Sequence, residues 1–137
     1  MKVYTQGSFD IVHSGHINLF KKCRLLAGDG EVVVALLSDK SYEKYRGYKP
    51  AKPFNERRVL LESCKYIDRV IESDNEKTKE DIKKINPDII IVGSDWVSKD
   101  IYSQYRITKE ELNPKLVYQP YTAGITSTEI KERIKGG

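Results

Sequence analysis

The sequence predicts an α/β fold, in which a parallel β-sheet lies between two layers of helices. Short apolar runs alternate with segments of helical periodicity along the chain, which is typical of strand–helix–strand units. Two runs, EVVVALLS at 31–38 and DIIIVG at 88–93, are apolar on both faces, as in strands covered on both sides. A length of 137 residues fits one domain. We therefore expect a single domain over residues 1–137, a Rossmann-like, doubly wound sheet of five parallel strands with helices on both faces.

The first elements follow from the spacing of apolar residues. Residues 3–5 are expected to form a strand and residues 14–27 an amphipathic helix, with Leu19 and Cys23 at helical spacing on its inward face. The Gly-Asp-Gly sequence that follows ends this helix. The strand at 31–38 comes next.

A basic segment follows the second strand. Residues 40–52 are predicted to lack regular structure, because Gly47, Pro50 and Pro53 interrupt the segment. Seven basic residues and two acidic ones lie between positions 40 and 58. The resulting positive field suits a polyanionic ligand; a solvated surface loop is the alternative.

The rest of the chain is predicted to alternate in the same way. Helices are expected at residues 53–66, 78–85, 108–112 and 128–135, and strands at 68–72, 88–93 and 115–119. Leu60, Leu61 and Cys64 are predicted to face inward from the first of these helices. A polar insert at 94–113 precedes the last strand. In such sheets ligands bind beyond the carboxyl ends of the strands, so functional residues are expected just after each strand.

The composition favours a cytoplasmic protein. The net charge of +4 is too small to demand nucleic acid, and the longest apolar run has six residues, against about 20 for a membrane span. The N-terminus does not resemble a signal peptide. The two cysteines, Cys23 and Cys64, are expected to be buried free thiols. We expect no membrane and no nucleic-acid partner.

The segment GSFDIVHSGH, residues 7–16, is the most informative in the chain. It contains the only two histidines, His13 and His16, at the turn into the first helix. Gly15 permits close approach of a ligand, and the free N–H groups of the helix end favour an anion. A zinc site is a weak alternative, because no further histidine and no cysteine pair supplies the remaining ligands. Ordinary N-capping or core histidines are the second alternative.

Four motifs resemble the cytidylyltransferase family of the HxGH nucleotidyltransferase superfamily. GSFDIVHSGH resembles the G-x-F-D-x-x-H-x-G-H entry motif, and ITSTEIKERI, residues 125–134, resembles the closing I-S-T-T-x-I motif. GSDW at 93–96 resembles G-D-D-W after the fourth strand, and residues 55–58 resemble an E-H-R segment. The motifs occur in the family's order over nearly the whole chain.

The resemblance implies in-line attack of a substrate phosphate on the α-phosphorus of CTP, with loss of pyrophosphate. The acceptor would be a small phosphorylated alcohol, with sn-glycerol 3-phosphate as the leading candidate. Mg²⁺ would accompany the triphosphate, and the motifs identify no protein ligand for it. The protein would be a homodimer. The residues implied in catalysis are His13, His16, Lys44 and Arg46. Those implied in nucleotide binding are Gly7, Ser8, Phe9, Asp10, Gly15, Arg57, Gly93, Tyr121, Thr122, Gly124, Ile125, Thr126, Ser127 and Thr128, and those on the acceptor side are Asp39, Lys65, Asp95 and Trp96.

Several positions depart from the family pattern. Tyr121 stands near the place of an arginine that precedes the closing threonine, Glu76 replaces a tryptophan and Lys65 an arginine. KPAKPFNER, residues 49–57, is closer to heptose-phosphate adenylyltransferases. An adenylyl- or cytidylyltransferase for another sugar phosphate, or a non-catalytic nucleotide-binding module, therefore stays open. An RNA-binding domain has little support, because no RNA-binding signature accompanies the tyrosines of the basic segment.

Overall fold

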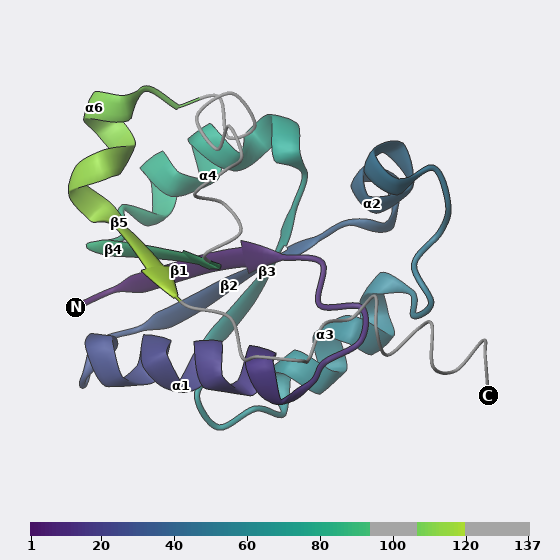
Figure 1. Cartoon of the computed structure of the whole chain (residues 1–137), viewed down its shortest axis with the longest axis horizontal. Helices are drawn as coiled ribbons and strands as arrows, with labels where there is room; N and C mark the ends of the chain where they lie inside the picture. Colours follow the sequence, from purple (N-terminus) through teal and green to yellow (C-terminus); the bar gives the residue numbers. More distant parts are fainter. Residues whose placement is uncertain (94–106, 120–137) are drawn as a thin grey trace.

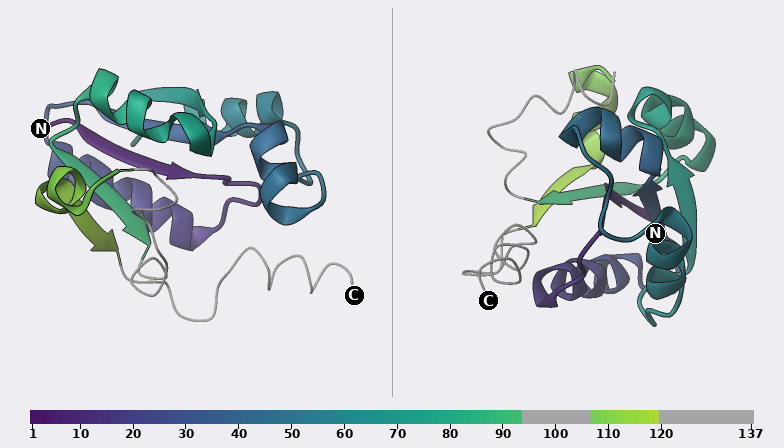
Figure 2. Two further views of the ribbon diagram at one scale, coloured as in Figure 1. Left: turned by 90° about the horizontal axis from the view of Figure 1, so that it is seen from above. Right: turned by 90° about the vertical axis from the view of Figure 1, so that its right-hand side faces the viewer.

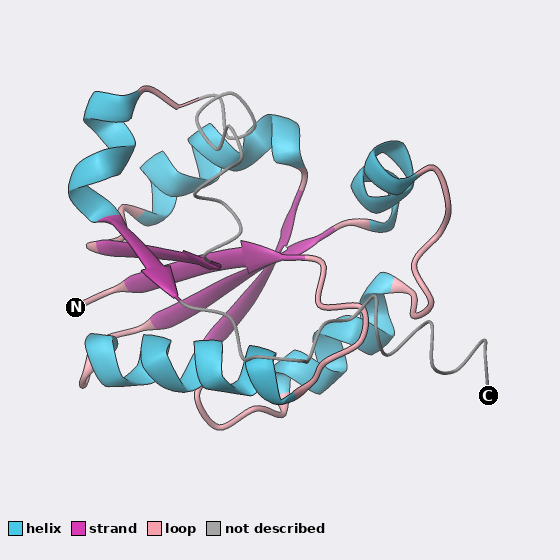
Figure 3. Cartoon of the chain, in the orientation of Figure 1, coloured by secondary structure: helices cyan, strands magenta, loops and turns pink. Residues whose placement is uncertain are grey.

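Five parallel strands form one sheet in the order β3-β2-β1-β4-β5 (Figures 1 and 3). The structure is a computed structural model that describes residues 1–93 and 107–119. The strands are β1 (Val3–Gly7), β2 (Val32–Leu37), β3 (Arg69–Ser73), β4 (Ile89–Gly93) and β5 (Leu116–Gln119). The strand order reverses direction between β1 and β4. The predicted Rossmann-like, doubly wound sheet is confirmed.

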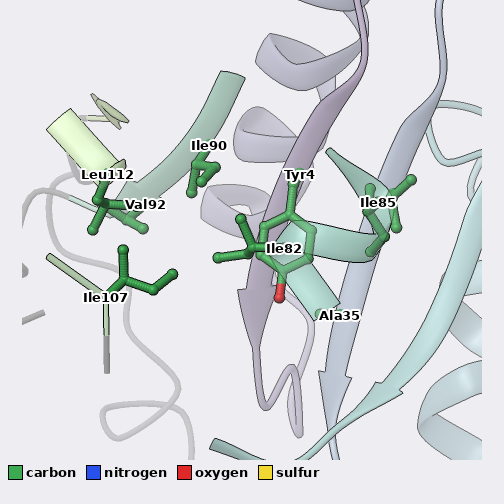
Figure 4. Packing of buried hydrophobic residues seen from close by; sticks show 9 residues of the cluster. Tyr4, Ala35, Ile82, Ile85, Ile90, Val92, Ile107 and Leu112 are labelled. Carbon is green, nitrogen blue, oxygen red and sulfur yellow. The ribbon is translucent and has the colours of Figure 1, made fainter. Parts of the chain in front are cut away.

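Helices cover both faces of the sheet, as predicted (Figures 1 and 2). Helices α1 (Ser14–Ala27) and α3 (Phe54–Glu62) lie on one face, and α4 (Thr78–Ile85) and α6 (Lys109–Leu112) lie on the other. On the α4 side, one cluster joins residues of three strands and both helices (Figure 4): Tyr4, Val33, Ala35, Ile82, Ile85, Ile90, Val92, Ile107 and Leu112. On the α1 and α3 side, Phe20 and Leu61 pack with Val34 and Leu36 of β2.

The two strands that are apolar on both faces occupy the interior of the sheet. The first five residues of β2 are buried, and β2 pairs with both β1 and β3. In β4, Ile90, Ile91 and Val92 are buried between β1 and β5. Since side chains alternate between faces along a strand, only a strand covered on both sides buries consecutive apolar residues.

The prediction that residues 40–52 lack regular structure is wrong for their first half. Helix α2 (Asp39–Arg46) begins at Ser38, whose Oγ accepts a hydrogen bond from the Ser41 N–H at 3.1 Å. It ends at Gly47, which adopts a left-handed conformation with φ of 79°. Tyr42 is 1% exposed and anchors the helix. The glycine and prolines therefore mark the end of a short helix rather than a segment without one.

Helix α3 is shorter than predicted and turns a different face inward. It ends at Glu62 rather than Tyr66, and Leu60 is 48% exposed, so its predicted inward orientation is wrong. The buried residues of α3 are Leu61 and Arg57. Arg57 has polar partners on this inward face, and sequence periodicity does not reveal them.

The other predictions agree with the described residues to within a few positions. Helices α1 and α4 have the predicted bounds, and short 3₁₀ turns, η1 (Asn75–Lys77) and η3 (Asn113–Lys115), precede α4 and β5. Both cysteines are free, as predicted, and Cys23 is buried; the predicted burial of Cys64 is wrong, because this residue follows the end of α3 and is only half-buried. In the part of the chain that the structure describes, no helix is long and apolar enough to cross a membrane. The helix expected at 128–135 lies outside the described residues.

Candidate active site

The two histidines lie where β1 leads into α1, on what we call the histidine turn (residues 8–16). This turn leaves the carboxyl end of β1, and β1 lies between β2 and β4, beside the point where the strand order reverses (Figure 1). Ligands of doubly wound sheets bind in the crevice at this reversal. The position predicted for the histidines is therefore confirmed by the topology.

His13 and His16 together form the N-terminal cap of α1. The Nδ1 atom of His13 accepts the Gly15 N–H at 3.1 Å, and Nδ1 of His16 accepts the His13 N–H at 3.2 Å. This is a reciprocal capping box in which imidazoles replace the usual hydroxyl and carboxylate. The rings stack with centroids 3.9 Å apart. The two histidines therefore do cap the helix, but the capping hydrogen bonds use only their Nδ1 atoms.

The capping bonds also determine which nitrogen carries the proton. A nitrogen that accepts a backbone N–H has no hydrogen of its own, so each neutral ring is protonated at Nε2. Burial, together with the neighbouring His13, lowers the pKa of His16 to about 4, although a hydrogen bond with the Ile11 backbone acts in the opposite direction. Burial also lowers the pKa of His13. Near neutral pH both rings are therefore uncharged, and each carries an Nε2–H group that can donate to an anionic oxygen. At His16 such an oxygen would compete with the hydrogen bond to the Ile11 backbone.

These lowered pKa values predict that the protein becomes less stable in mild acid. The unfolded chain binds a proton at His16 below its ordinary pKa of 6.5, whereas the folded chain does so only near pH 4. The unfolded state therefore holds more protons, and the free energy of unfolding should fall as the pH decreases from about 6.5 to about 4. We expect a loss on the order of 2 kcal/mol, reduced from the full effect because the ring is partly exposed.

Urea unfolding at several pH values between 7 and 4.5 measures this loss. The His16→Gln variant, which lacks the titrating ring, is the control and should lose less stability over the same interval. A free energy of unfolding that stays constant or rises as the pH falls would contradict the expectation.

The Phe9 ring packs against the ring of His16. Its ring meets the His16 ring edge-on at 5.2 Å and packs against Phe20 at 5.1 Å. Phe9 has φ of 44°, a left-handed conformation that is rare for a side chain of this size. Gly7 makes room for the ring, because a Cβ atom there would lie 2.9 Å from Cζ of Phe9. Phe9, predicted as nucleotide-binding, thus also packs against His16, and Gly7, predicted likewise, makes room for Phe9.

Replacing Gly7 with alanine is therefore expected to destabilise the protein by about 1–3 kcal/mol, because the added methyl group overlaps the Phe9 ring. Urea unfolding measures the change. In a Phe9→Leu background the smaller side chain should accept the methyl group, so the cost of Gly7→Ala should shrink. An equal cost in both backgrounds would contradict this explanation.

Helix α2 carries Lys44 and Arg46, the predicted phosphate-binding cations. The Lys44 ammonium forms an ion pair with Glu76 of η1, and the Arg46 guanidinium lies over the Tyr42 ring at 5.7 Å. Both side chains are exposed. Asp74 accepts hydrogen bonds from the hydroxyl groups of Ser38 and Ser41, and so ties α2 to η1. The phosphate contacts of Lys44 and Arg46 stay predictions.

The buried Arg57 and the half-exposed Asp39 form a junction of hydrogen bonds between several segments. The Arg57 side chain is fully buried and donates to the backbone oxygens of Ser8, Leu37 and Lys52, at 2.8–2.9 Å, and to Asp39 Oδ1 at 2.6 Å. The other Asp39 oxygen accepts the Phe54 N–H. These bonds give Arg57 a structural role, and the phosphate contact that the resemblance implies stays a prediction. The same applies to the acceptor contact of Asp39.

Asp10, like Arg57, forms hydrogen bonds with backbone groups of other segments. Its carboxylate, 3% exposed, accepts the backbone N–H groups of Ala51 and Lys52, both at 2.9 Å, and lies 3.4 Å from the Tyr42 hydroxyl. Tyr42 was not predicted as a site residue. Its place four positions after a serine N-cap, one turn into the helix, is the signal that could have identified it among the tyrosines of this segment.

Two more predicted site residues lie outside the histidine turn. Lys65 lies in the connection between α3 and β3, where its ammonium contacts the Tyr66 ring at 5.2 Å. Gly93 ends β4. The remaining predicted residues lie outside the described ones, so their roles stay predictions: Asp95, Trp96, Tyr121, Thr122, Gly124, Ile125, Thr126, Ser127 and Thr128.

The described residues do not form a ready-made metal site. Within residues 1–93 and 107–119, no group of three or more His, Cys, Asp or Glu side chains is arranged to hold an ion. Both Asp10 oxygens are already used by backbone amides.

Known proteins share both the sequence and the fold. A family model described as cytidylyltransferase-like matches residues 4–133. The chain is 35% identical over 136 residues to glycerol-3-phosphate cytidylyltransferase of Bacillus subtilis (strain 168), and the match covers 98% of each chain. It is 31% identical over 134 residues to FAD synthase of Korarchaeum cryptofilum (strain OPF8), covering 97% of this chain and 90% of that one.

A solved structure agrees with these matches. The lipopolysaccharide core biosynthesis protein from Thermoplasma volcanium GSS1 superposes with a TM-score of 0.73 at 30% identity, covering 89% of this chain and 98% of that one. The family match spans the sheet, the histidine turn and α2. With its capped histidine pair at the reversal of the sheet, the chain belongs to the cytidylyltransferase-like family and is a nucleotidyltransferase.

Proposed function

We propose that the protein transfers CMP from CTP to the phosphate of a small phosphorylated alcohol, with glycerol 3-phosphate as the acceptor. An oxygen of the acceptor phosphate forms a bond to the α-phosphorus, the bond from that phosphorus to the bridging oxygen breaks, and pyrophosphate leaves with the electron pair. The products are CDP-glycerol and pyrophosphate. No covalent enzyme intermediate is needed, because the acceptor phosphate is already a nucleophile.

The observation that carries the proposal is the pair of neutral, Nε2-protonated imidazoles at the N-terminus of α1. Negative charge on the oxygens around the α-phosphorus increases in the transition state, and preorganised donors stabilise that charge. Each Nδ1 atom is held by a backbone N–H, so the rings are oriented before substrate arrives and lose little freedom on binding. Mg²⁺ would arrive on the triphosphate, where it neutralises charge on the phosphates.

The choice of CTP and glycerol 3-phosphate rests on the similarity to the Bacillus subtilis cytidylyltransferase over 98% of the chain. A second candidate is adenylyl transfer from ATP to FMN, because the FAD synthase of Korarchaeum cryptofilum is 31% identical over 97% of the chain. FAD consists of FMN and AMP joined through a pyrophosphate linkage, so the same attack on an α-phosphorus would produce it.

Activity assays with each combination of two nucleotides and three acceptors distinguish these functions. The protein is incubated with Mg²⁺ and either CTP or ATP, together with glycerol 3-phosphate, FMN or heptose 1-phosphate, and pyrophosphate release is followed. We expect release with CTP and glycerol 3-phosphate and a product with the mass of CDP-glycerol. Activity only with ATP and FMN, or only with ATP and heptose 1-phosphate, would overturn the proposed substrates without overturning nucleotidyl transfer.

We also propose that the protein is a homodimer, as the family resemblance implies. Size-exclusion chromatography with light scattering should then give twice the 15.8 kDa mass of one chain. A mass equal to one chain at micromolar concentration would contradict the dimer.

A further inference from the structure

The connection between α2 and α3 is attached to the histidine turn by one carboxylate. We call residues 47–53 the connecting segment; it leads from the end of α2 to the start of α3. Two consecutive amides of this segment, those of Ala51 and Lys52, donate to the two oxygens of Asp10 at 2.9 Å. Asp10 lies three residues before His13, so these bonds attach the connecting segment to the histidine turn.

The same carboxylate also faces α2. The hydroxyl of Tyr42, a buried residue of α2, lies 3.4 Å from Asp10 Oδ2. Lys44 and Arg46 follow Tyr42 on the same short helix. The position of these two cations relative to the histidines therefore depends on contacts made by Asp10.

Arg57 strengthens the attachment from the other side. It donates to the backbone oxygens of Lys52 and Ser8, which belong to the connecting segment and to the histidine turn. The Asp10 carboxylate of the histidine turn thus accepts amides of the connecting segment, and the Arg57 guanidinium donates to carbonyl groups of both segments. Such bonds to charged groups are stronger than those between neutral groups.

We propose that Asp10 is a positioning residue for nucleotidyl transfer, which holds α2 and the connecting segment at a fixed place relative to His13 and His16. The carboxylate acts through the backbone of residues 51 and 52 rather than on the phosphates or on a metal ion. This inference rests on the nucleotidyltransferase activity of the family and is independent of which acceptor is used.

The burial of Asp10 supports a positioning role over direct binding. Both oxygens of this carboxylate accept backbone hydrogen bonds at 2.9 Å, which fix its orientation toward the connecting segment. Its 3% exposure leaves little surface for a substrate to reach. Loss of such an anchor displaces groups that stabilise the transition state, and small displacements of this kind lower turnover strongly.

Amide hydrogen exchange of the free protein, followed by NMR, tests the attachment without any substrate. The Asp10→Asn variant keeps the size of the side chain but replaces one acceptor oxygen by an NH₂ group. We expect the amide of Ala51 or Lys52 to exchange about tenfold faster or more. Asp29→Asn, a matched charge removal in the exposed turn between α1 and β2, should leave both exchange rates unchanged.

Kinetics then separate positioning from direct binding. In Asp10→Asn we expect kcat to fall about tenfold to a hundredfold, with KM for CTP changed by less than about threefold. The Mg²⁺ concentration that gives half-maximal rate should not change. A markedly raised Mg²⁺ requirement with unchanged exchange at residues 51 and 52 would overturn the proposal and make Asp10 a metal-binding residue.

A second variant tests the same contact while leaving the carboxylate intact. Ala51→Pro removes one of the two N–H donors at an exposed position that already follows a proline. If Asp10 positions the connecting segment, Ala51→Pro should lower kcat in the same direction as Asp10→Asn. Wild-type kcat in Ala51→Pro would show that Asp10 acts directly on substrate and would overturn the proposal. Both kinetic tests use whichever nucleotide and acceptor the protein turns over, so the proposed substrates can fail while this inference stands.

Discussion

Replacing His16 with alanine is expected to lower turnover about a hundredfold to a thousandfold, while nucleotide affinity stays within a few-fold of the wild type. The loss of one preorganised donor at the reacting phosphorus costs about 3–4 kcal/mol in the transition state. Ground-state binding of the triphosphate draws mainly on other donors and on charge, so it should change little. Pyrophosphate release measures turnover, and isothermal titration with CTP measures affinity.

The capping role of His16 requires a matched variant. His16→Ala also removes the acceptor of the His13 N–H, which should cost the helix about 0.5–2 kcal/mol. Glutamine is a favoured residue at this position of a capping box, so His16→Gln should keep the cap and lose the imidazole. We expect both variants to lose turnover and only the alanine variant to lose stability. Normal turnover in His16→Gln, or equal loss of affinity and turnover in both variants, would contradict a catalytic imidazole.

Replacing Arg57 with methionine is expected to destabilise the protein by about 3–5 kcal/mol. The guanidinium is fully buried, and its removal leaves the carbonyl oxygens of Ser8 and Leu37 without that donor, together with the paired carboxylate of Asp39. Each carbonyl group left without its donor costs about 1–3 kcal/mol, whereas the Asp39 side chain, which is 48% exposed, can be hydrated. Urea unfolding measures the change, and Arg57→Lys, with fewer donors, should be intermediate.

Arg58→Met provides the control on the same helix. Arg58 is exposed and forms an ion pair with Glu62 one turn further along, so its loss should cost no more than about 0.5 kcal/mol. If Arg57 served only to bind phosphate, Arg57→Met would raise KM for the nucleotide and leave stability near that of the wild type. That combination would refute the structural role.

The roles of Asp10 and Arg57 could not be predicted from the sequence. The resemblance placed both near the phosphates, and the structure shows each bonded to backbone groups distant in sequence, such as Ala51 from Asp10 and Leu37 from Arg57. A motif identifies which residue types recur, but it does not show which atoms they contact. Leu60 illustrates the same limit, because it is exposed while the charged Arg57 of the same helix is buried.

The sequence by itself determined the alternation of strands and helices, the parallel sheet and the place of the histidines. These features depend on local patterns: consecutive apolar residues in β2 and β4, helical spacing in α1 and α4, and a motif at the end of β1. Only the tertiary structure decided that α2 is a helix, that the imidazoles cap α1 through Nδ1, and that Asp10 joins two segments. Those features depend on contacts between residues far apart in the chain or on the direction of single atoms, neither of which residue spacing specifies.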